Sequence, residues 1–343
     1  MLRKSIKIAL TLLLGGLFLW LAFRNVPLRE VWDYARQITF YWVPPFGLTL
    51  LTGHFLRAER WRLLIEHDKK ELNRSTLVAG VLTGYLLNIV GPRLGEVSRP
   101  VYVAKREGLS ASKLMGTIVL ERIIDMATML LLLLVVCIYL ITDLELLRQI
   151  FGEQTVRMFS GGFALTELLW IVGLLLLFGL GGWAGWSLLC YLGRRFESVR
   201  PWVDRIRNAV RMFRDGILAA RQVKRWGLFL SYTLLIWACY TAMSWIPFWM
   251  FDMQTVYDLS LLDALVVTVI SAIGIAIPSP GGIGTYHYFV KQTLLVLFAV
   301  PAVTGLAYAT ITHAATVLFV ALFTPLSLAV DKYVATREGK PVN

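Results

Sequence analysis

Three charged residues interrupt a long apolar stretch, residues 115–140, and are the first candidates for chemistry. Glu121, Arg122 and Asp125 would lie in the first turns of a membrane helix that begins near Met115. A charge at the centre of a bilayer costs about 2.5–3.5 kcal/mol unless it is paired or faces water. At the spacing i, i+4, i+8 and i+11, one stripe of this helix carries Thr117, Glu121, Asp125 and Thr128. We expect the stripe to face protein or a cavity, not lipid.

Three roles fit this charged cluster: a proton relay, a head-group site, or a salt-bridge network that only holds the fold. Arg122 and Asp125 are spaced to pair within the helix at i, i+3. Glu121 would then be left for another basic residue. The candidates are Arg93, Arg99 and Lys113. A purely structural network stays an alternative, because buried charges need partners whatever their function.

A Gly-Pro break supplies a second set of candidates. The apolar run 77–90 ends at Gly91-Pro92, and a half-helix is predicted to begin at Gly95, flanked by Arg93 and Arg99. A helix N-terminus carries about half a positive charge, and a guanidinium group can hold a phosphate through two hydrogen bonds. This pattern suits a phosphate, although both arginines could instead extend to water at the inner leaflet. Glu96 fits a carboxylate that stabilises the start of the half-helix.

A second break follows the apolar run 264–277 and reads Pro-Ser-Pro-Gly-Gly-Ile-Gly, residues 278–284. Another half-helix would begin at Gly284, so we expect backbone contacts to the substrate here. The candidate residues are Gly281, Gly282 and Gly284. His287, Lys291 and His313 lie nearby, and we expect the two histidines to be hydrogen-bonded packing residues.

The elements that must position these residues are membrane helices. Hydrophobic residues make up 57% of the 343, above the roughly 45–50% of a soluble domain, and they occur in long runs. We predict an all-α polytopic membrane protein with about six full spans and two re-entrant helical hairpins. The predicted spans are 6–23, 40–56, 115–141, 163–192, 226–250 and 303–330. We expect the first to be an uncleaved span, because no small-x-small cleavage site follows it.

The charge distribution orients these spans. With both termini in the cytoplasm, 27 of the 34 Lys and Arg residues fall in inside segments, as cytoplasmic loops require. These segments are 1–7, 57–74, 93–113, 193–225 and 331–343. The net charge of +12 therefore points to acidic membrane lipid and not to nucleic acid. The three cysteines are isolated, so they predict neither a disulfide nor a zinc site.

This topology makes the two hairpins enter from opposite sides, which predicts an inverted repeat with halves at about 75–141 and 263–330. Broken helices at matching positions of two inverted halves point to a transport site near the midplane. Between the halves, residues 194–225 form a basic linker. Within it, residues 199–217 alternate an apolar stripe with arginines, which is typical of an amphipathic helix on anionic lipid.

Motifs for catalysis are missing from the sequence. No HExxH, Ser-His-Asp order or Walker loop occurs, so we predict no catalytic residue, no metal and no cofactor. Whether the chain is an enzyme stays open, with a non-enzyme favoured. We expect any transport to run without ATP hydrolysis on this chain.

These motifs resemble a known family, the integral-membrane, flippase-like region of lysylphosphatidylglycerol synthase, which also occurs as stand-alone proteins. The matching positions are Gly91-Pro92-Arg93-Leu94-Gly95-Glu96 with Arg99, Glu121-Arg122-x-x-Asp125, and the break at 278–284. The resemblance covers almost the whole chain. It implies movement of a lipid, such as an aminoacylated phosphatidylglycerol, between leaflets. Only 13 residues follow Val330, so we expect the synthase's soluble transferase activity to be absent.

The sequence therefore predicts a lipid flippase or transporter of the cytoplasmic membrane, with membrane lipids as partners and protein partners unknown. Two alternatives stay open. One is a membrane-embedded lipid or glycolipid transferase, and the other is a non-transporting partner of an envelope-lipid enzyme. The predicted substrate-binding residues are Arg93, Glu96, Arg99, Glu121, Arg122, Asp125, Gly281, Gly282 and Gly284.

Overall fold

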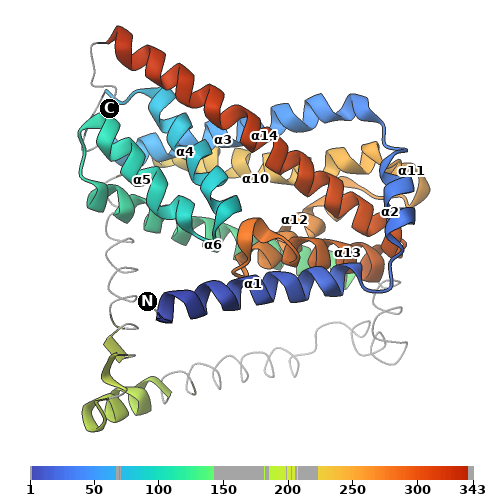
Figure 1. Cartoon of the computed structure of the whole chain (residues 1–343), viewed down its shortest axis with the longest axis horizontal. Coiled ribbons are helices and arrows are strands. Elements are labelled where there is room, and N and C mark those ends of the chain that lie inside the picture. The colour runs from blue at the N-terminus through green and yellow to red at the C-terminus, as the bar shows by residue number, and fades with distance from the viewer. Residues whose placement is uncertain are drawn as a thin grey trace. The chain divides into compact units, whose positions relative to one another are not determined.

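The architecture comes from a computed structural model of the chain (Figure 1). It describes residues 2–66, 69, 71–142, 181, 185–197, 199–201, 203–204, 207 and 223–338. Across these residues the chain forms helices, turns and bends, without a strand. It divides into two compact units, unit 1 with residues 1–136 and 220–343 and unit 2 with residues 137–219. In unit 2, residues 185–195 are helical and Val203 lies against Gly193.

Unit 1 contains the helices that concern function. In chain order they are α1 (Leu2–Phe23), α2 (Leu28–Ala35), η1 (Phe40–Trp42), α3 (Val43–Ile65), α4 (Arg74–Val90), α5 (Leu94–Glu107), α6 (Ala111–Thr142), α10 (Trp226–Met250), α11 (Met253–Val256), α12 (Leu261–Ala276), η2 (Pro280–Gly282), α13 (Thr285–Phe298) and α14 (Ala302–Arg337). α6 continues from unit 1 into unit 2.

The helices support a polytopic membrane fold, although they do not establish the predicted six spans. Three of those described, α6, α10 and α14, are long and apolar enough to cross a membrane. α1 and α2 would add a fourth span if their 80° bend lies within one crossing. α10 matches the predicted span 226–250 residue for residue. The predicted span 163–192 and linker 194–225 lie largely outside the described residues.

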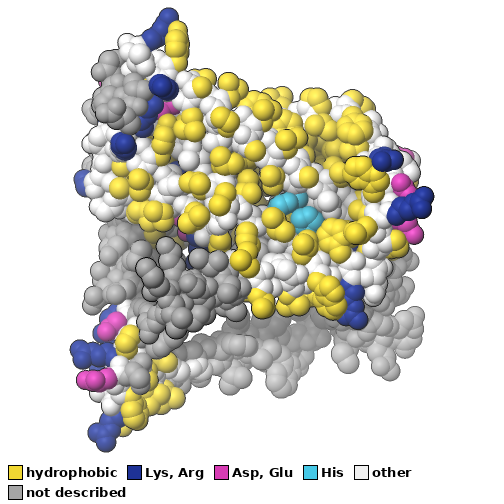
Figure 2. Space-filling view, in the orientation of Figure 1, with side chains coloured by type: hydrophobic (Ala, Val, Ile, Leu, Met, Phe, Trp, Pro, Cys, Tyr) yellow, Lys and Arg dark blue, Asp and Glu magenta, His cyan; other side chains and the backbone are white. Residues whose placement is uncertain are grey.

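The surface of unit 1 agrees with a membrane setting. Figure 2 shows a face covered mainly by hydrophobic side chains, with charged side chains gathered where α14 ends and where α2 lies. α1 begins and α14 ends toward the same end of the unit (Figure 1). A wide apolar band between two charged ends is what a bilayer requires of a protein that crosses it.

The first predicted hairpin consists of α4 and α5. Asn73 begins α4 by accepting a hydrogen bond from the Ser75 backbone N–H at 3.0 Å. Arg93 turns the chain between the helices with a left-handed φ of 62°. The two helices then pack with their backbones in contact, since a β-carbon on Gly95 would collide with the Gly84 carbonyl. Glycine at position 95 is thus required by this close approach.

The second predicted hairpin consists of α12 and α13, joined through η2. Ser260 and Asp263 form a capping box at the start of α12. Gly284, with a φ of +84°, turns the chain into α13 and lies so close to the Gly15 carbonyl of α1 that no β-carbon fits. Lys291 of α13 donates hydrogen bonds to the last carbonyls of α1, at Leu21 (3.2 Å) and Ala22 (2.6 Å).

The two breaks lie against each other. η2 packs on α4, and a β-carbon on Gly281 would lie 3.2 Å from the Cα atom of Ile89, one residue before the end of α4. The backbone carbonyl of Gly281 also accepts a hydrogen bond from His313 Nε2 of α14 at 2.9 Å. The two breaks are therefore in direct contact.

Asp331 holds the end of α14 against the first hairpin. Its side chain is fully buried and accepts hydrogen bonds from four others. These are Ser75 (3.1 Å) and Thr76 (2.6 Å) of α4, and Tyr102 (2.5 Å) and Arg106 (2.9 Å) of α5. One carboxylate thus fixes three helices at one end of unit 1.

Substitution of Asp331 tests how much this carboxylate contributes to stability. We expect Asp331→Asn to lower the free energy of unfolding by about 2–3 kcal/mol, because the amide NH2 faces donors and the charged hydrogen bonds are lost. The measurement is the midpoint of thermal unfolding in detergent, with Asp33→Asn on exposed α2 as the matched control. Equal midpoints for the two variants would contradict a structural role for Asp331.

Candidate functional site

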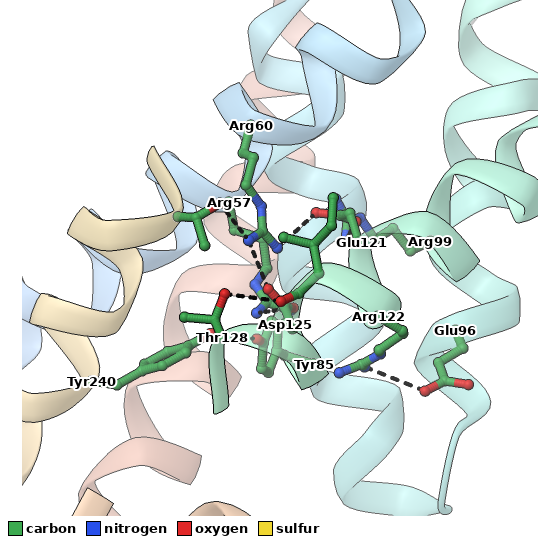
Figure 3. Close-up of polar contacts among 12 residues, drawn as sticks. Arg57, Arg60, Tyr85, Glu96, Arg99, Glu121, Arg122, Asp125, Thr128 and Tyr240 are labelled. Carbon is green, nitrogen blue, oxygen red and sulfur yellow. Dashed lines mark hydrogen bonds and ion pairs between the residues drawn. The ribbon is translucent and has the colours of Figure 1, made fainter. Parts of the chain in front are cut away.

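A small cavity lies among α3, α4, α5 and α6 at the first break, and most of its polar lining is charged (Figure 3). Its volume is about 30 Å³, which admits water but no lipid head group. The charged lining residues are Arg57, Glu96, Arg99, Glu121, Arg122 and Asp125. Five of these six were predicted from the sequence as site residues, and Arg57 was not.

The predicted stripe on α6 places the carboxylates. Trp61 of α3 donates a hydrogen bond from Nε1 to Thr117 Oγ1 at 2.8 Å, at the start of the stripe. One and two turns further along α6, Glu121 and Asp125 meet arginines of α3. For Thr117, Glu121 and Asp125, the prediction that the stripe faces protein or a cavity is confirmed.

Arg60 connects the two carboxylates. Its Nη1 donates to Asp125 Oδ1 at 2.7 Å, and its Nη2 lies 3.3 Å from Glu121 Oε1. A further bond runs to Thr233 Oγ1 of α10 at 3.2 Å. The residue is 0% exposed. Arg60 therefore joins α3, α6 and α10 next to the cavity.

Two more arginines lie beside the cavity. Arg99 of α5 places Nη1 2.9 Å from Glu121 Oε2, and its guanidinium lies 3.9 Å from the Trp61 ring centroid. Arg57 of α3 donates from Nη2 to Asp125 Oδ2 at 3.2 Å. Its guanidinium also lies 5.7 Å from the ring centroid of Tyr85. Both are fixed by a carboxylate on one side and an aromatic ring on the other.

The cluster has more positive than negative charge. Three buried guanidinium groups, of Arg57, Arg60 and Arg99, face the carboxylates of Glu121 and Asp125, which leaves a formal charge of +1. More donors than acceptors are left without a hydrogen-bond partner among the described residues. The buried donors are Arg57 Nε, Arg60 Nε, and Arg99 Nε and Nη2, against one acceptor, Glu121 Oε2. A buried site with excess positive charge and free donors is suited to bind an anion.

The rim of the cavity carries a separate ion pair. Arg122 Nη2 of α6 lies 3.3 Å from Glu96 Oε1 of α5, and both side chains are substantially exposed. The predicted pairing of Arg122 with Asp125 is wrong, because Arg122 points toward α5 while Asp125 points toward α3 (Figure 3). Exposed pairs of this kind contribute about 0–1 kcal/mol, so the rim separates easily.

Four predicted residues lie outside the cavity lining. Arg93 is exposed at the turn before α5. The three glycines of the second break pack against α1, α4 and α12 instead: Gly281, Gly282 and Gly284. The structure thus brings Glu96, Arg99, Glu121, Arg122 and Asp125 together, and Arg93 and the glycines lie apart from them.

The start of α5 differs from the predicted phosphate-binding helix end. Its first amides already have acceptors: Leu94 N–H donates to Gly91 O (3.3 Å), Gly95 N–H to Asn88 Oδ1 (2.7 Å) and Glu96 N–H to Arg93 O (3.2 Å). An anion would find no free amide there. The unpartnered donors belong to the arginine side chains.

Arg57 and Arg60 are absent from the site residues that the sequence predicts. The predicted second span ends at Leu56 and residues 57–74 are predicted to be cytoplasmic, whereas α3 continues to Ile65. Helical spacing was the available signal, because the buried residues Ala58, Trp61 and Ile65 continue an apolar stripe past Leu56. Positive charge near the end of a span is also accounted for by topology alone.

The two buried carboxylates of the site are each bound by arginines, which suits a role as fixed charges that hold the arginines in place. Among residues the structure describes, no group of three or more His, Cys, Asp and Glu side chains is arranged to hold a metal ion. The arrangement is suited to binding and positioning.

Comparison with known proteins adds a family. A sequence model described as the lysylphosphatidylglycerol synthase TM region matches residues 8–323, nearly the whole chain. No curated protein matches the chain, and no solved structure matches it.

Proposed function

Because this chain belongs to the lysylphosphatidylglycerol synthase TM-region family, we propose that it is a lipid transporter, which moves a phosphate-bearing envelope lipid between leaflets of the cytoplasmic membrane. The observation that carries the proposal is the excess positive charge of the buried arginine cluster. A phosphodiester carries one negative charge, which would balance the formal +1 of the cluster. Charge neutrality in a low-dielectric site is a strong requirement.

The geometry of the arginines fits a phosphate group. Arg99 presents two unpartnered donors, Nε and Nη2, from one guanidinium plane. This is the fork that holds two phosphate oxygens at once. Arg57 adds one further donor, Nε. Glu121 and Asp125 would serve to hold these arginines in place, so that little side-chain ordering remains for the moment of binding.

Because the cavity is small, the proposed function requires the helices around it to move. A head group needs several times the roughly 30 Å³ present, so the rim of the cavity must open for binding. The rim pair of Glu96 and Arg122 is the weakest tie between these helices at the cavity. Opening there would admit the head group while the acyl chains stay in lipid beside the exposed apolar residues Val97 and Met126.

An inverted repeat and a midplane site are parts of this proposal. The contact between η2 and Ile89 supports them, because two hairpins inserted from opposite sides would meet at their breaks. Movement of one hairpin would then be transmitted to the other through Gly281.

Orientation follows from the charge distribution and can be measured. In a variant without the native cysteines, we expect a cysteine at exposed Lys105 to be labelled only from the cytoplasm. One at exposed Asp258 should be labelled only from outside. A membrane-impermeant maleimide applied to cells and to inverted vesicles distinguishes the sides. Labelling of position 105 from outside would remove the opposed hairpins.

Transport is tested by leaflet exchange. The full chain, reconstituted into vesicles, should speed the exchange of fluorescent phosphatidylglycerol, detected by loss of dithionite-resistant signal. Fluorescent glucosylceramide, which lacks phosphate, should exchange at the rate of protein-free vesicles. Equal acceleration of both probes would contradict phosphate recognition, and acceleration of neither would contradict transport of phosphatidylglycerol.

A further inference from the structure

The second break carries a pair of buried histidines that the arginine site does not use. His287 of α13 and His313 of α14 have ring centroids 5.0 Å apart in an edge-on arrangement. Because a carbonyl can only accept, His313 Nε2 is the protonated nitrogen that donates to Gly281 O. Its other nitrogen, Nδ1, is left as an acceptor when the ring is neutral. His313 of the pair is thus bonded directly to η2, the element that touches α4.

His287 has an unmet hydrogen-bonding requirement. The residue is 6% exposed, and Nδ1 has no hydrogen-bond partner within the described chain. Buried polar atoms are nearly always paired, so an unpaired ring nitrogen is an exception that needs an explanation. The nearby Tyr286 hydroxyl is already bonded to Thr312 Oγ1 at 3.0 Å. Packing alone would be served better by an apolar ring of the same size.

The groups around the pair come from every packed element. α13 contributes Tyr286, next to His287, and Lys291, one turn further along the helix. α14 contributes Tyr308, which lies near Tyr286. α1 contributes the Phe23 ring, 6.4 Å from His287. Lys291 is bound to carbonyls of α1. η2 contributes only backbone. Among the side chains that the structure describes, no carboxylate contacts either imidazole.

We propose that His287 and His313 form a proton-binding site, which holds one proton for the pair and links its occupancy to the position of the second break. Two imidazoles this close share a single proton, because two adjacent positive charges without a carboxylate repel each other. Proton binding adds a charge that the closed structure does not balance. It therefore favours a state in which η2 moves from α4 and water reaches the rings.

The link to transport rests on the proposed function, whereas proton binding itself does not. If η2 and α4 move together, protonation at the second break changes access to the arginine site at the first. By linkage, the bound lipid must change proton affinity by the same factor. A proton gradient would then drive lipid toward one leaflet.

Proton binding is tested on the full chain in nanodiscs with isotope-labelled histidine. The sequence has four histidines, so their ring resonances can be assigned by substitution. We expect the resonances of His287 and His313 to titrate between about pH 4 and 7, and His287→Gln to alter the titration of His313. His313→Asn keeps a donor for Gly281 O but binds no proton, and it should alter the titration of His287. Absence of titration in the parent protein over this range would overturn the proposal.

Coupling is tested separately in vesicles. With one proton per lipid, a gradient of one pH unit should shift the leaflet distribution of fluorescent phosphatidylglycerol by up to about tenfold. His287→Gln should exchange the lipid without this shift. Exchange that ignores the gradient in the parent protein would overturn the coupling and leave lipid transport standing. Absence of any exchange would refute the proposed function, while the titration would still decide on proton binding.

Discussion

Arg60→Met is expected to lower the free energy of unfolding by about 3–5 kcal/mol, enough to remove most folded protein from the membrane. The substitution removes the buried contacts of Arg60 with Glu121, Asp125 and Thr233, of which two involve a carboxylate. Methionine fills most of the arginine volume, so the loss reports charge and not a cavity. The measurements are the yield of folded protein and the midpoint of thermal unfolding in detergent.

A matched control lies two residues further along α3. Arg62 pairs with Glu59 and Glu66 of its own helix at 2.9 Å each, and its side chain remains 18% exposed. Arg62→Met should cost less than about 1 kcal/mol, as partly exposed helix pairs do. Equal losses for the two substitutions would show that the buried network contributes nothing beyond an ordinary helical ion pair.

Arg99→Lys is expected to slow lipid exchange at least about tenfold while leaving the protein folded. Lysine keeps the charge next to Glu121 but lacks the two unpartnered donors, and one charged hydrogen bond is worth about 1.5–3 kcal/mol. Arg57→Lys should act in the same direction with a smaller effect, since it removes one such donor. Exchange rates are compared in vesicles that contain equal amounts of folded protein.

Arg29→Lys on exposed α2 is the control, with no expected change in rate. A parent-like rate for Arg99→Lys would assign the arginines to the fold alone. Arg93 gives a further contrast. It was predicted as a phosphate ligand, yet it lies exposed outside the cavity lining. A severe transport defect in Arg93→Ala with a mild one in Arg99→Lys would place head-group binding at the turn before α5.

The sequence allowed the prediction of helices better than that of contacts between them. Apolar runs and Gly-Pro breaks located α4, α5, α12 and α13, because both signals are local. The α6 stripe also followed from local spacing. The partners of the stripe did not, since Arg57 and Arg60 lie more than 60 positions earlier and only folding brings them to Glu121 and Asp125.

The positive-inside rule is a second reason why the sequence does not predict Arg57 and Arg60 as site residues. Arginines at the end of a span satisfy the positive-inside rule, so Arg57 and Arg60 already had an explanation. The arginine with the most suggestive sequence context, Arg93, proved to be exposed. Helix packing determines which of the two arginines is buried. Gly84 and Gly95 let α4 and α5 approach closely, and Arg99 lies buried at this contact. No spacing rule reports which of two flanking arginines faces a neighbouring helix.

The size and charge of the closed cavity have a consequence for the electrical tightness of the membrane. An opening that holds only water, beside a cluster with excess positive charge, repels cations and hydrated protons, as an arginine does in a water channel. At rest the site would therefore pass neither protons nor metal cations, although charged residues lie within the membrane helices. A cell could keep many copies without dissipating the proton and cation gradients of its membrane.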